Sequence, residues 1–243
     1  MTIQSKGKRP VGRTITRLSL QSKIVLTMTL FLLTLGTVGF YLLEHHNPAT
    51  MGTLNAAGKF QAAFFQSVTT RTAGFASISQ SGLTNGSKLL ACMLMIVGGS
   101  PAGTAGGIKT TTVAVLLLTA ISVLRGNKDT ECYGRKITFE IIRVGITITL
   151  VTFVFWLFGV TVMTVIEPQQ KVLDLMFEAT SAMATVGLTV DLTPVLSDIS
   201  HVVLMLMMYI GRIGPMTMAL IFSGHVDKKN QFRTLPEAKI MVG

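Results

Sequence analysis

The strongest constraint on the fold is a series of apolar stretches that are too long for the core of a soluble domain. Residues 24–43 contain no charged side chain. As an α-helix this stretch would be about 30 Å long, which matches the hydrocarbon core of a bilayer. Further apolar stretches cover residues 89–108, 113–124, 137–166 and 202–222. Only 13% of all residues are charged, about half the share of a typical soluble domain. The sequence therefore predicts an all-α membrane protein.

The basic residues are distributed asymmetrically around these stretches. Lys and Arg are concentrated in residues 1–23, 125–136 and 223–243, whereas the other connections hold few of them. Cytoplasmic loops of membrane proteins are enriched in Lys and Arg. We therefore expect four spans in the bacterial plasma membrane, with both termini in the cytoplasm. The same distribution argues against a nucleic-acid-binding surface, despite the formal net charge of +10. On the opposite side we expect Glu44, His45 and His46 to be exposed, and we do not expect them to bind a metal ion.

The sequence also contains an internal repeat with an offset of 113 residues. Residues 24 and 137 begin the first and third spans, residues 63–67 align with 176–180, and Gly98 aligns with Gly211. Each unit has a span, a short amphipathic helix, a Thr-x-Gly-apolar tetrapeptide and a second span. The short helices, predicted over residues 59–70 and 171–183, cannot cross a bilayer. We expect them to be re-entrant half-helices, since irregular backbone at membrane depth must be covered by protein or line a wet cavity.

The two tetrapeptides are candidates for an ion selectivity filter. They consist of Thr72, Ala73, Gly74 and Phe75 in the first unit and of Thr185, Val186, Gly187 and Leu188 in the second. Backbone carbonyls of such loops can replace the hydration shell of a potassium ion, and the C-terminal end of a preceding half-helix favours a cation. We expect K⁺ to bind the carbonyls of Thr72, Ala73, Gly74, Thr185, Val186 and Gly187. The alternative is a pair of ordinary glycine-containing turns outside the membrane.

A glycine-rich segment interrupts the second apolar stretch. Residues 98–107 include five glycines and a proline, which an uninterrupted membrane helix would exclude. Such a segment should face a wet vestibule, and we interpret it as a gate in the ion path. The residues assigned to this gate are Gly98, Gly99, Ala102, Gly103, Thr104, Ala105, Gly106 and Gly107. A phosphate-binding glycine loop is the alternative, but the Gly-Lys-Ser/Thr ending of such loops is missing.

Three basic residues lie close to these motifs in the sequence. Lys109 follows the glycine-rich segment and is assigned to the gate with it. We interpret this residue as an anchor that faces the cytoplasm rather than as a repulsive charge in the pore. Arg212 lies about ten residues from either end of the predicted last span, where an unpartnered charge costs several kcal/mol. We therefore assign Arg212 to the gate, with carbonyls of the glycine-rich segment as its expected partners. Arg71 is expected to brace the first half-helix.

These motifs resemble those of one family of membrane proteins. Residues 64–75 resemble the third pore loop of the Trk/Ktr/HKT potassium transporter superfamily, and residues 97–110 are similar to its glycine-rich segment. Residues 181–189 resemble its fourth pore loop, and residues 211–215 its arginine motif. The resemblance covers the chain from about residue 9. It implies the C-terminal half of a membrane subunit of the Ktr type, because the family's chains have four units and this sequence shows two.

The resemblance implies potassium uptake by passive, channel-like permeation, with no enzymatic activity and no organic cofactor. It leaves open whether sodium is transported as well. Expected partners are the lipid bilayer, further pore units (a second copy or the missing N-terminal half) and a cytoplasmic nucleotide-binding regulatory subunit of the RCK type. The alternatives are a non-conducting product of a split or truncated gene and a secondary transporter for another small solute. The expected division is a basic N-terminus (1–23), a first pore unit (24–124), a cytoplasmic loop (125–136), a second pore unit (137–222) and a tail (223–243).

Overall fold

The computed structural model describes residues 18–101, 103, 105–127 and 129–214, and these residues are mainly helical. The first half contains four helices: α2 (Leu20–Glu44), α3 (Ala56–Thr69), α4 (Asn85–Ile96) and α5 (Thr110–Leu124). Two short strands follow, β1 (Glu131–Cys132) and β2 (Arg135–Lys136). The second half contains α6 (Phe139–Ile166), α7 (Val172–Met183), the 3₁₀ helix η1 (Thr193–Val195) and α8 (Asp198–Ile213).

Two of the described helices are long and apolar enough to cross a membrane. They are α2, with 25 residues, and α6, with 28 residues. The second predicted span is divided, as its glycine content indicates, into the shorter apolar helices α4 and α5. The two short helices expected before the Thr-x-Gly tetrapeptides are present as α3, with 14 residues, and α7, with 12 residues.

Four helices begin at polar residues that cap their first turn. Ser19, Asn55, Thr84 and Ser197 each accept a hydrogen bond from the backbone amide three residues further on. Such a cap contributes about 1 kcal/mol because it satisfies an amide that the helix itself leaves unpaired. The caps Thr84 and Ser197 are 113 positions apart, so α4 and α8 begin at corresponding places in the two halves.

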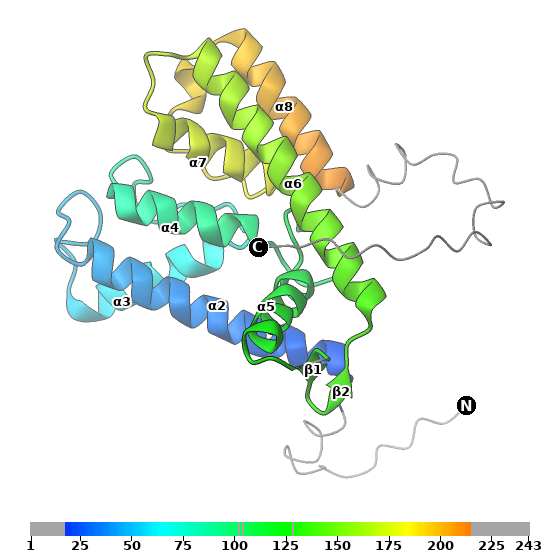
Figure 1. Ribbon diagram of the computed structural model, residues 1–243. Helices are drawn as coiled ribbons and strands as arrows, with labels where there is room; N and C mark the ends of the chain where they lie inside the picture. Colours follow the sequence, from blue (N-terminus) through cyan, green and yellow to red (C-terminus); the bar gives the residue numbers. More distant parts are fainter. Residues whose placement is uncertain (1–17, 102, 104, 128, 215–243) are drawn as a thin grey trace, which may run out of the picture.

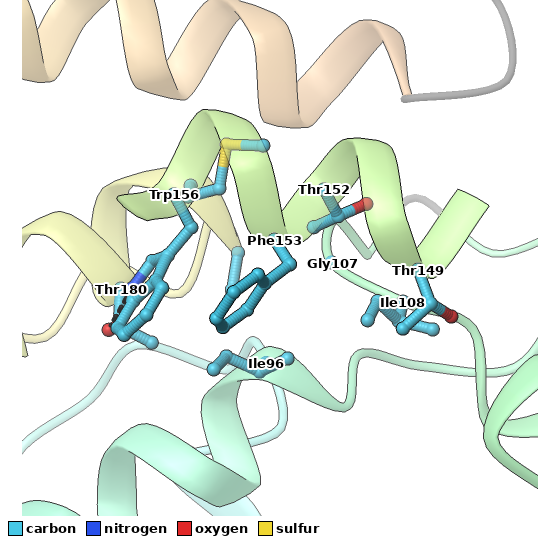
Figure 2. A pocket seen from close by; sticks show the side chains of 10 residues that line it. Ile96, Gly107, Ile108, Thr149, Thr152, Phe153, Trp156 and Thr180 are labelled. Atoms are coloured by element: carbon cyan, nitrogen blue, oxygen red, sulfur yellow. Dashed lines mark hydrogen bonds between the residues drawn. The ribbon is translucent and has the colours of Figure 1, made fainter. Parts of the chain in front are cut away.

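The two halves lie side by side and share a core (Figure 1). Helices α2, α3 and α4 form one group and α6, α7 and α8 the other, with α4 packed against α7 at the junction. A single hydrophobic cluster crosses this junction; its fully buried members include Phe40, Met51, Met95, Met163, Leu175 and Phe177. The halves therefore stabilise one another. A small apolar pocket of about 140 Å³ lies at the same junction, beside α6 (Figure 2).

The predicted cytoplasmic loop 125–136 contains a β-hairpin that the sequence did not indicate. Strands β1 and β2 pair antiparallel, with Glu131 opposite Lys136. The two turn residues, Tyr133 and Gly134, have φ values of 50° and 71°, as a two-residue turn of type I′ requires. Strands of two residues are too short to show an alternating pattern.

Arg212 lies close to the point where the described part of the last predicted span ends. This residue occupies the last turn of α8, which begins at Asp198 and ends at Ile213. Gly214 follows with a φ of 88°, a left-handed conformation that ends the helix. Arg212 is therefore near the end of the described helix, and its predicted depth within the whole span stays a prediction. The remainder of the predicted span, residues 215–222, lies outside the described residues.

Candidate functional site

The first Thr-x-Gly loop, residues 70–75, begins where α3 ends. Thr72 and Gly74 have positive φ values of 67° and 77°. The side chain of Thr69 fixes the far end of the loop, because its hydroxyl accepts from the amide of Phe75 at 2.8 Å and donates to the carbonyl of Phe75 at 2.6 Å. The amides of Ala73 and Gly74 donate to the carbonyl of Thr69. The loop is thus a defined structure that starts at the C-terminal end of a short helix.

The second Thr-x-Gly loop, residues 184–190, has the same backbone pattern. Thr185 and Gly187 have φ values of 53° and 90°, at positions exactly equivalent, 113 residues later, to Thr72 and Gly74. A positive φ is rare for a β-branched residue and costs of order 1–3 kcal/mol. Its occurrence at equivalent threonines in both halves therefore requires a common cause.

The two loops approach each other closely. A β-carbon at Gly74 would lie 2.2 Å from the carbonyl oxygen of Val186 and 3.7 Å from the α-carbon of Gly187. A β-carbon at Gly187 would lie 3.9 Å from the α-carbon of Gly74. Only glycine fits at position 74, because any other residue would collide with the backbone of the second loop.

Polar side chains of the short helices support the chain that leaves each loop. Glu178 of α7 is buried and accepts hydrogen bonds from the amide of Val190 at 3.0 Å and from the hydroxyls of Thr189 and Thr193. In the first half, the side chain of Gln66 of α3 pairs with that of Gln80 through two hydrogen bonds, of 2.6 and 3.1 Å. Sequence reasoning did not assign a role to these residues. The available signal was a polar side chain with hydrogen-bonding capacity within each short helix.

The glycine-rich loop, residues 97–109, returns beside its own start. The amide of Gly98 donates to the carbonyl of Ile108 and the amide of Ile108 to that of Ile96, both at 2.9 Å. A β-carbon at Gly98 would lie 1.9 Å from the carbonyl oxygen of Gly106, so the two arms of the loop can approach only through glycine. Ala102 and Thr104 of the predicted gate lie outside the described residues.

One hydrogen bond joins the glycine-rich loop to the second Thr-x-Gly loop. The amide of Gly106 donates to the hydroxyl of Thr185 at 3.0 Å. A β-carbon at Gly106 would lie 2.8 Å from the carbonyl oxygen of Ala184. The glycine-rich loop is therefore in direct contact with the end of α7 and with the strained threonine that follows it.

The ammonium group of Lys109 binds backbone carbonyls of the glycine-rich loop. It donates to the carbonyl of Ala105 and approaches that of Gly103 at 3.5 Å. Arg212 lies close enough to Lys109 for the two positive charges to interact. The expected contact between Arg212 and the carbonyls of this loop stays a prediction.

A cavity of about 590 Å³ extends along the second Thr-x-Gly loop. The loop residues Thr185 and Gly187 line this cavity, and so do Thr189 and Thr193, which follow them in the sequence. Arg212, near the end of α8, also lines it. The cavity therefore places the strained backbone of the second loop and the charge of Arg212 beside the same space.

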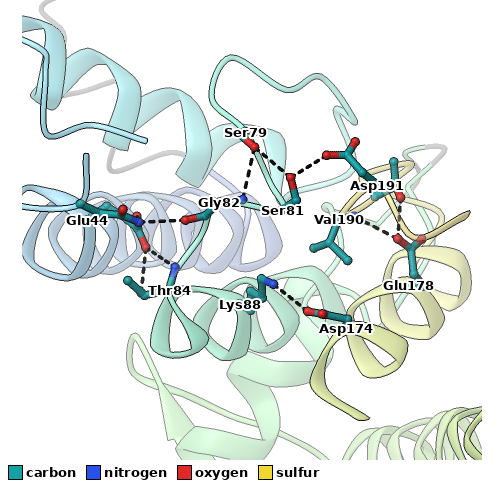
Figure 3. Close-up of polar contacts among 12 residues, drawn as sticks. Glu44, Ser79, Ser81, Gly82, Thr84, Lys88, Asp174, Glu178, Val190 and Asp191 are labelled. Carbon is teal, nitrogen blue, oxygen red and sulfur yellow. Dashed lines mark hydrogen bonds and ion pairs between the residues drawn. The ribbon is translucent and has the colours of Figure 1, made fainter. Parts of the chain in front are cut away.

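Two polar contacts tie the halves together near these loops (Figure 3). The ammonium of Lys88 on α4 lies 2.7 Å from the carboxylate of Asp174 on α7, and the side chain of Lys88 is only 8% exposed. The hydroxyl of Ser81 donates to Asp191 at 2.6 Å. Neither contact was predicted, because each joins residues far apart in the sequence.

A carboxylate at the end of each long helix is hydrogen-bonded to the start of a later helix: Glu44 joins α2 to α4, and Glu167 joins α6 to α8. Glu44 accepts from the amide and hydroxyl of Thr84 at 2.9 and 2.8 Å. It is completely buried, so the expectation that it is exposed is wrong; its charge is compensated by hydrogen bonds. Glu167 accepts from the amide of Ser197 and the hydroxyl of Ser200, both at 2.8 Å. Hydrogen bonds from Ser197 and Ser200 lower the pKa of the Glu167 carboxyl.

The expected bracing role of Arg71 takes a different form in the structure. A nitrogen of its guanidinium approaches the carbonyl of Thr29 on α2 at 3.4 Å. Arg71 therefore connects the start of the first Thr-x-Gly loop to α2 rather than to α3.

The arrangement of these helices defines the fold of the chain as that of the potassium transporter TrkH. The crystal structure of TrkH from Vibrio parahaemolyticus superposes with a TM-score of 0.68 over 82% of this chain and 44% of that chain, at 17% identity. The chain belongs to the TrkH family of cation transport proteins, whose family model matches residues 11–233.

Several curated proteins are similar to this chain in sequence. The chain is 36% identical over 225 residues to the Ktr system potassium uptake protein B of Bacillus subtilis. The aligned residues make up 93% of this chain and 50% of that relative. It is 38% identical over 206 residues to the protein of the same name from Vibrio alginolyticus, covering 85% and 45%. It is 34% identical over 230 residues to the potassium/sodium uptake protein NtpJ of Enterococcus hirae, covering 93% and 51%. The chain thus spans about half the length of the curated relatives it matches.

Proposed function

We propose that this chain supplies two of the four pore units of a potassium-permeable channel, through which the ion moves passively down its electrochemical gradient. The carbonyls of Thr72, Ala73, Gly74, Thr185, Val186 and Gly187 would bind the ion. The observation that carries this proposal is the pair of facing loops in which equivalent Thr and Gly residues have positive φ. Alternating backbone conformations of this kind turn successive carbonyls toward one side, as ion coordination by a backbone filter requires.

The short helices support a cation rather than an anion at this place. Both α3 and α7 end directly before a Thr-x-Gly loop. The C-terminal end of a helix carries a partial negative charge equivalent to about half an elementary charge. We interpret α3 and α7 as re-entrant half-helices, since neither is long enough to cross a bilayer. The repeat of 113 residues would then make the two halves equivalent pore units.

The glycine-rich loop is proposed to act as the gate. It contacts the second Thr-x-Gly loop through the bond from Gly106 to Thr185, so a shift of the loop changes the surroundings of the ion path. Lys109 would keep the loop in one position by binding its carbonyls, and Arg212 would add a second positive charge beside it. Loops with little side-chain packing are suited to such movement.

The remaining pore units would come from another chain or from a second copy of this one. Two loops supply half of the coordination that a dehydrated cation needs, and the cavity along the second loop leaves one side of that loop uncovered. We propose a cytoplasmic nucleotide-binding regulatory subunit as a further partner, docked on the basic cytoplasmic segments. The names of two relatives as components of a Ktr system are consistent with a multi-subunit assembly.

Replacement of Gly187 tests the proposed filter directly. Gly187→Asp should abolish the preference for potassium over sodium, because the substitution strains a left-handed position and adds a charge beside the ion. Gly134→Asp is the matched control, since Gly134 also has a positive φ but lies in the β-hairpin with no atom near its β-position. The measurement is uptake of rubidium and sodium into vesicles that contain the assembled protein. An unchanged ion preference in Gly187→Asp would remove this residue from the filter.

A further inference from the structure

The small pocket at the junction of the two halves is bounded by four parts of the chain: α6, the end of α4, the returning arm of the glycine-rich loop and the end of α7. Figure 2 shows Thr149, Phe153 and Trp156 of α6 on one side of it, with Ile96 and Ile108 opposite. Gly107, at the end of the glycine-rich loop, also lines the pocket. Any molecule in the pocket therefore touches α6 and the returning arm of the glycine-rich loop at the same time.

The chemistry of the lining favours an apolar occupant. The hydroxyls of Thr149 and Thr152 donate to carbonyls of their own helix at 2.9 and 2.8 Å. The indole nitrogen of Trp156 donates to the hydroxyl of Thr180 at 2.8 Å, and that hydroxyl donates to the carbonyl of Met176. These polar side chains thus have partners within the protein. The remaining surface consists of hydrocarbon groups, and a cavity of comparable size with an apolar lining stays dry and binds small apolar molecules.

The position of the pocket on α6 identifies the source of that occupant. Side chains of α6 around Phe153 are strongly exposed in this chain: Leu150 by 61%, Val154 by 54% and Leu157 by 48%. They belong to a helix with the length and hydropathy of a membrane span. In a bilayer this face is surrounded by acyl chains, and a chain end that enters the pocket beside them gains dispersion contacts with its lining.

We propose that the pocket binds the end of an acyl chain of a membrane lipid. The chain end packs against Phe153 and Trp156 of α6 and against Gly107 and Ile108, and so supports the returning arm of the glycine-rich loop. This inference requires that α6 lies in a bilayer, but it does not depend on potassium conduction by the chain.

Trp156 makes the proposal measurable because it is the only tryptophan in the sequence. The full chain is placed in lipid nanodiscs, and its fluorescence is compared between lipids with and without bromine atoms on the acyl chains, which quench indole on contact. Thr149→Phe and Ile96→Phe fill the pocket from opposite walls. In both variants we expect about two-fold weaker quenching than in the unchanged chain, because the added ring excludes the lipid from the filled space.

Thr147→Phe is the matched control. Thr147 lies two residues before Thr149 on α6, is exposed and does not line the pocket, so this variant should be quenched like the unchanged chain. Equal quenching in all four proteins would overturn the proposal, because it would show that bulk lipid alone reaches Trp156. The same comparison is made with dissolved bromobenzene as the quencher. If filling the pocket weakens quenching by bromobenzene but not quenching by brominated lipid, the pocket binds small apolar molecules and the proposal is wrong.

Discussion

Thr72 and Thr185 adopt a backbone conformation that β-branched residues rarely tolerate, and neighbouring groups keep them there. Thr69 holds both backbone groups of Phe75 behind the first threonine. The second threonine is held by the bond from its amide to the carbonyl of Ala182 and by the bond that its hydroxyl accepts from Gly106. Strain that the surrounding structure maintains in this way is typical of ligand-binding positions. The strain at these residues therefore supports the proposed role of the two loops in ion binding.

Replacement of Thr72 separates stability from function. Thr72→Gly should raise the stability of the chain by about 1 kcal/mol or leave it unchanged, since glycine removes the strain but loses more entropy on folding. The same variant should lower the preference for potassium over sodium, because the loop becomes less rigid. Thermal unfolding in detergent and ion uptake into vesicles measure the two effects. Unaltered selectivity would show that the strained conformation of Thr72 has no role in ion binding.

The contacts of Lys109 allow a test of the proposed gate. Lys109→Met removes the ammonium that binds the carbonyls of Ala105 and Gly103, so the loop should move more freely and rubidium uptake should rise several-fold. Lys59→Met is the control, because Lys59 likewise donates to a carbonyl, that of His45, but lies outside the three loops. A fall in uptake in a correctly assembled Lys109→Met protein would show that the ammonium keeps the pathway open.

At the scale of helices, the contact between α4 and α7 determines how the two halves fit together. The ion pair of Lys88 and Asp174 lies at this contact, and the two side chains are 8% and 20% exposed. Removal of one partner of a buried pair costs about 3–5 kcal/mol because the other charge is left unpaired, whereas replacement of both by apolar residues can be neutral. Because the two side chains differ in exposure, removal of one partner should cost more stability than removal of the other.

We expect Asp174→Asn to be more destabilising than Lys88→Met. The first variant leaves the more deeply buried ammonium without a counter-ion, and the second leaves a carboxylate that water can reach. The double variant Lys88→Met/Asp174→Leu should recover most of the lost stability. Unfolding of all three variants in detergent gives the comparison. Equal losses in the single variants, without recovery in the double variant, would mean that the pair does not hold the junction.

The sequence allowed the helices and loops to be located, but not the contacts between them. Short apolar stretches followed by Thr-x-Gly predicted α3 and α7 closely, because the relevant signals are local. The burial of Glu44 was missed because its partner Thr84 is 40 positions away, and a carboxylate at the end of a span normally reaches water. The pairing of Lys88 with Asp174 was missed for the same reason. The predicted depth of Arg212 stays a prediction, because residues 215–222 of the predicted span lie outside the part of the chain that the structure describes.

At the scale of the whole molecule, the proposed pore is incomplete within one chain. Two Thr-x-Gly loops face each other, while the cavity along the second loop has no covering unit in the described structure. Carbonyl groups left without partners in a bilayer cost several kcal/mol each. The chain should therefore associate with other pore units, and its activity should depend on them.

Complementation of growth tests this dependence. Expressed alone in a bacterium that lacks potassium uptake, the chain should not restore growth at limiting potassium. Co-expression with a chain that carries two further pore units should restore it, and Gly187→Asp should abolish the effect while Gly134→Asp should not. Robust growth with the chain alone would instead demonstrate a pore formed by two copies.

The pairing of Lys88 with Asp174 also has a consequence for how the chain is made. The two residues are 86 positions apart, and synthesis proceeds at about 5–20 residues per second. The synthesis of Lys88 therefore precedes the synthesis of its counter-ion Asp174 by roughly 4–17 seconds. During this interval a helix of 12 residues with a charge in its first turn cannot settle in hydrocarbon by itself. We expect α4 to stay in a hydrated place until α7 arrives, so the first half reaches its final position only after the chain has been synthesised through α7.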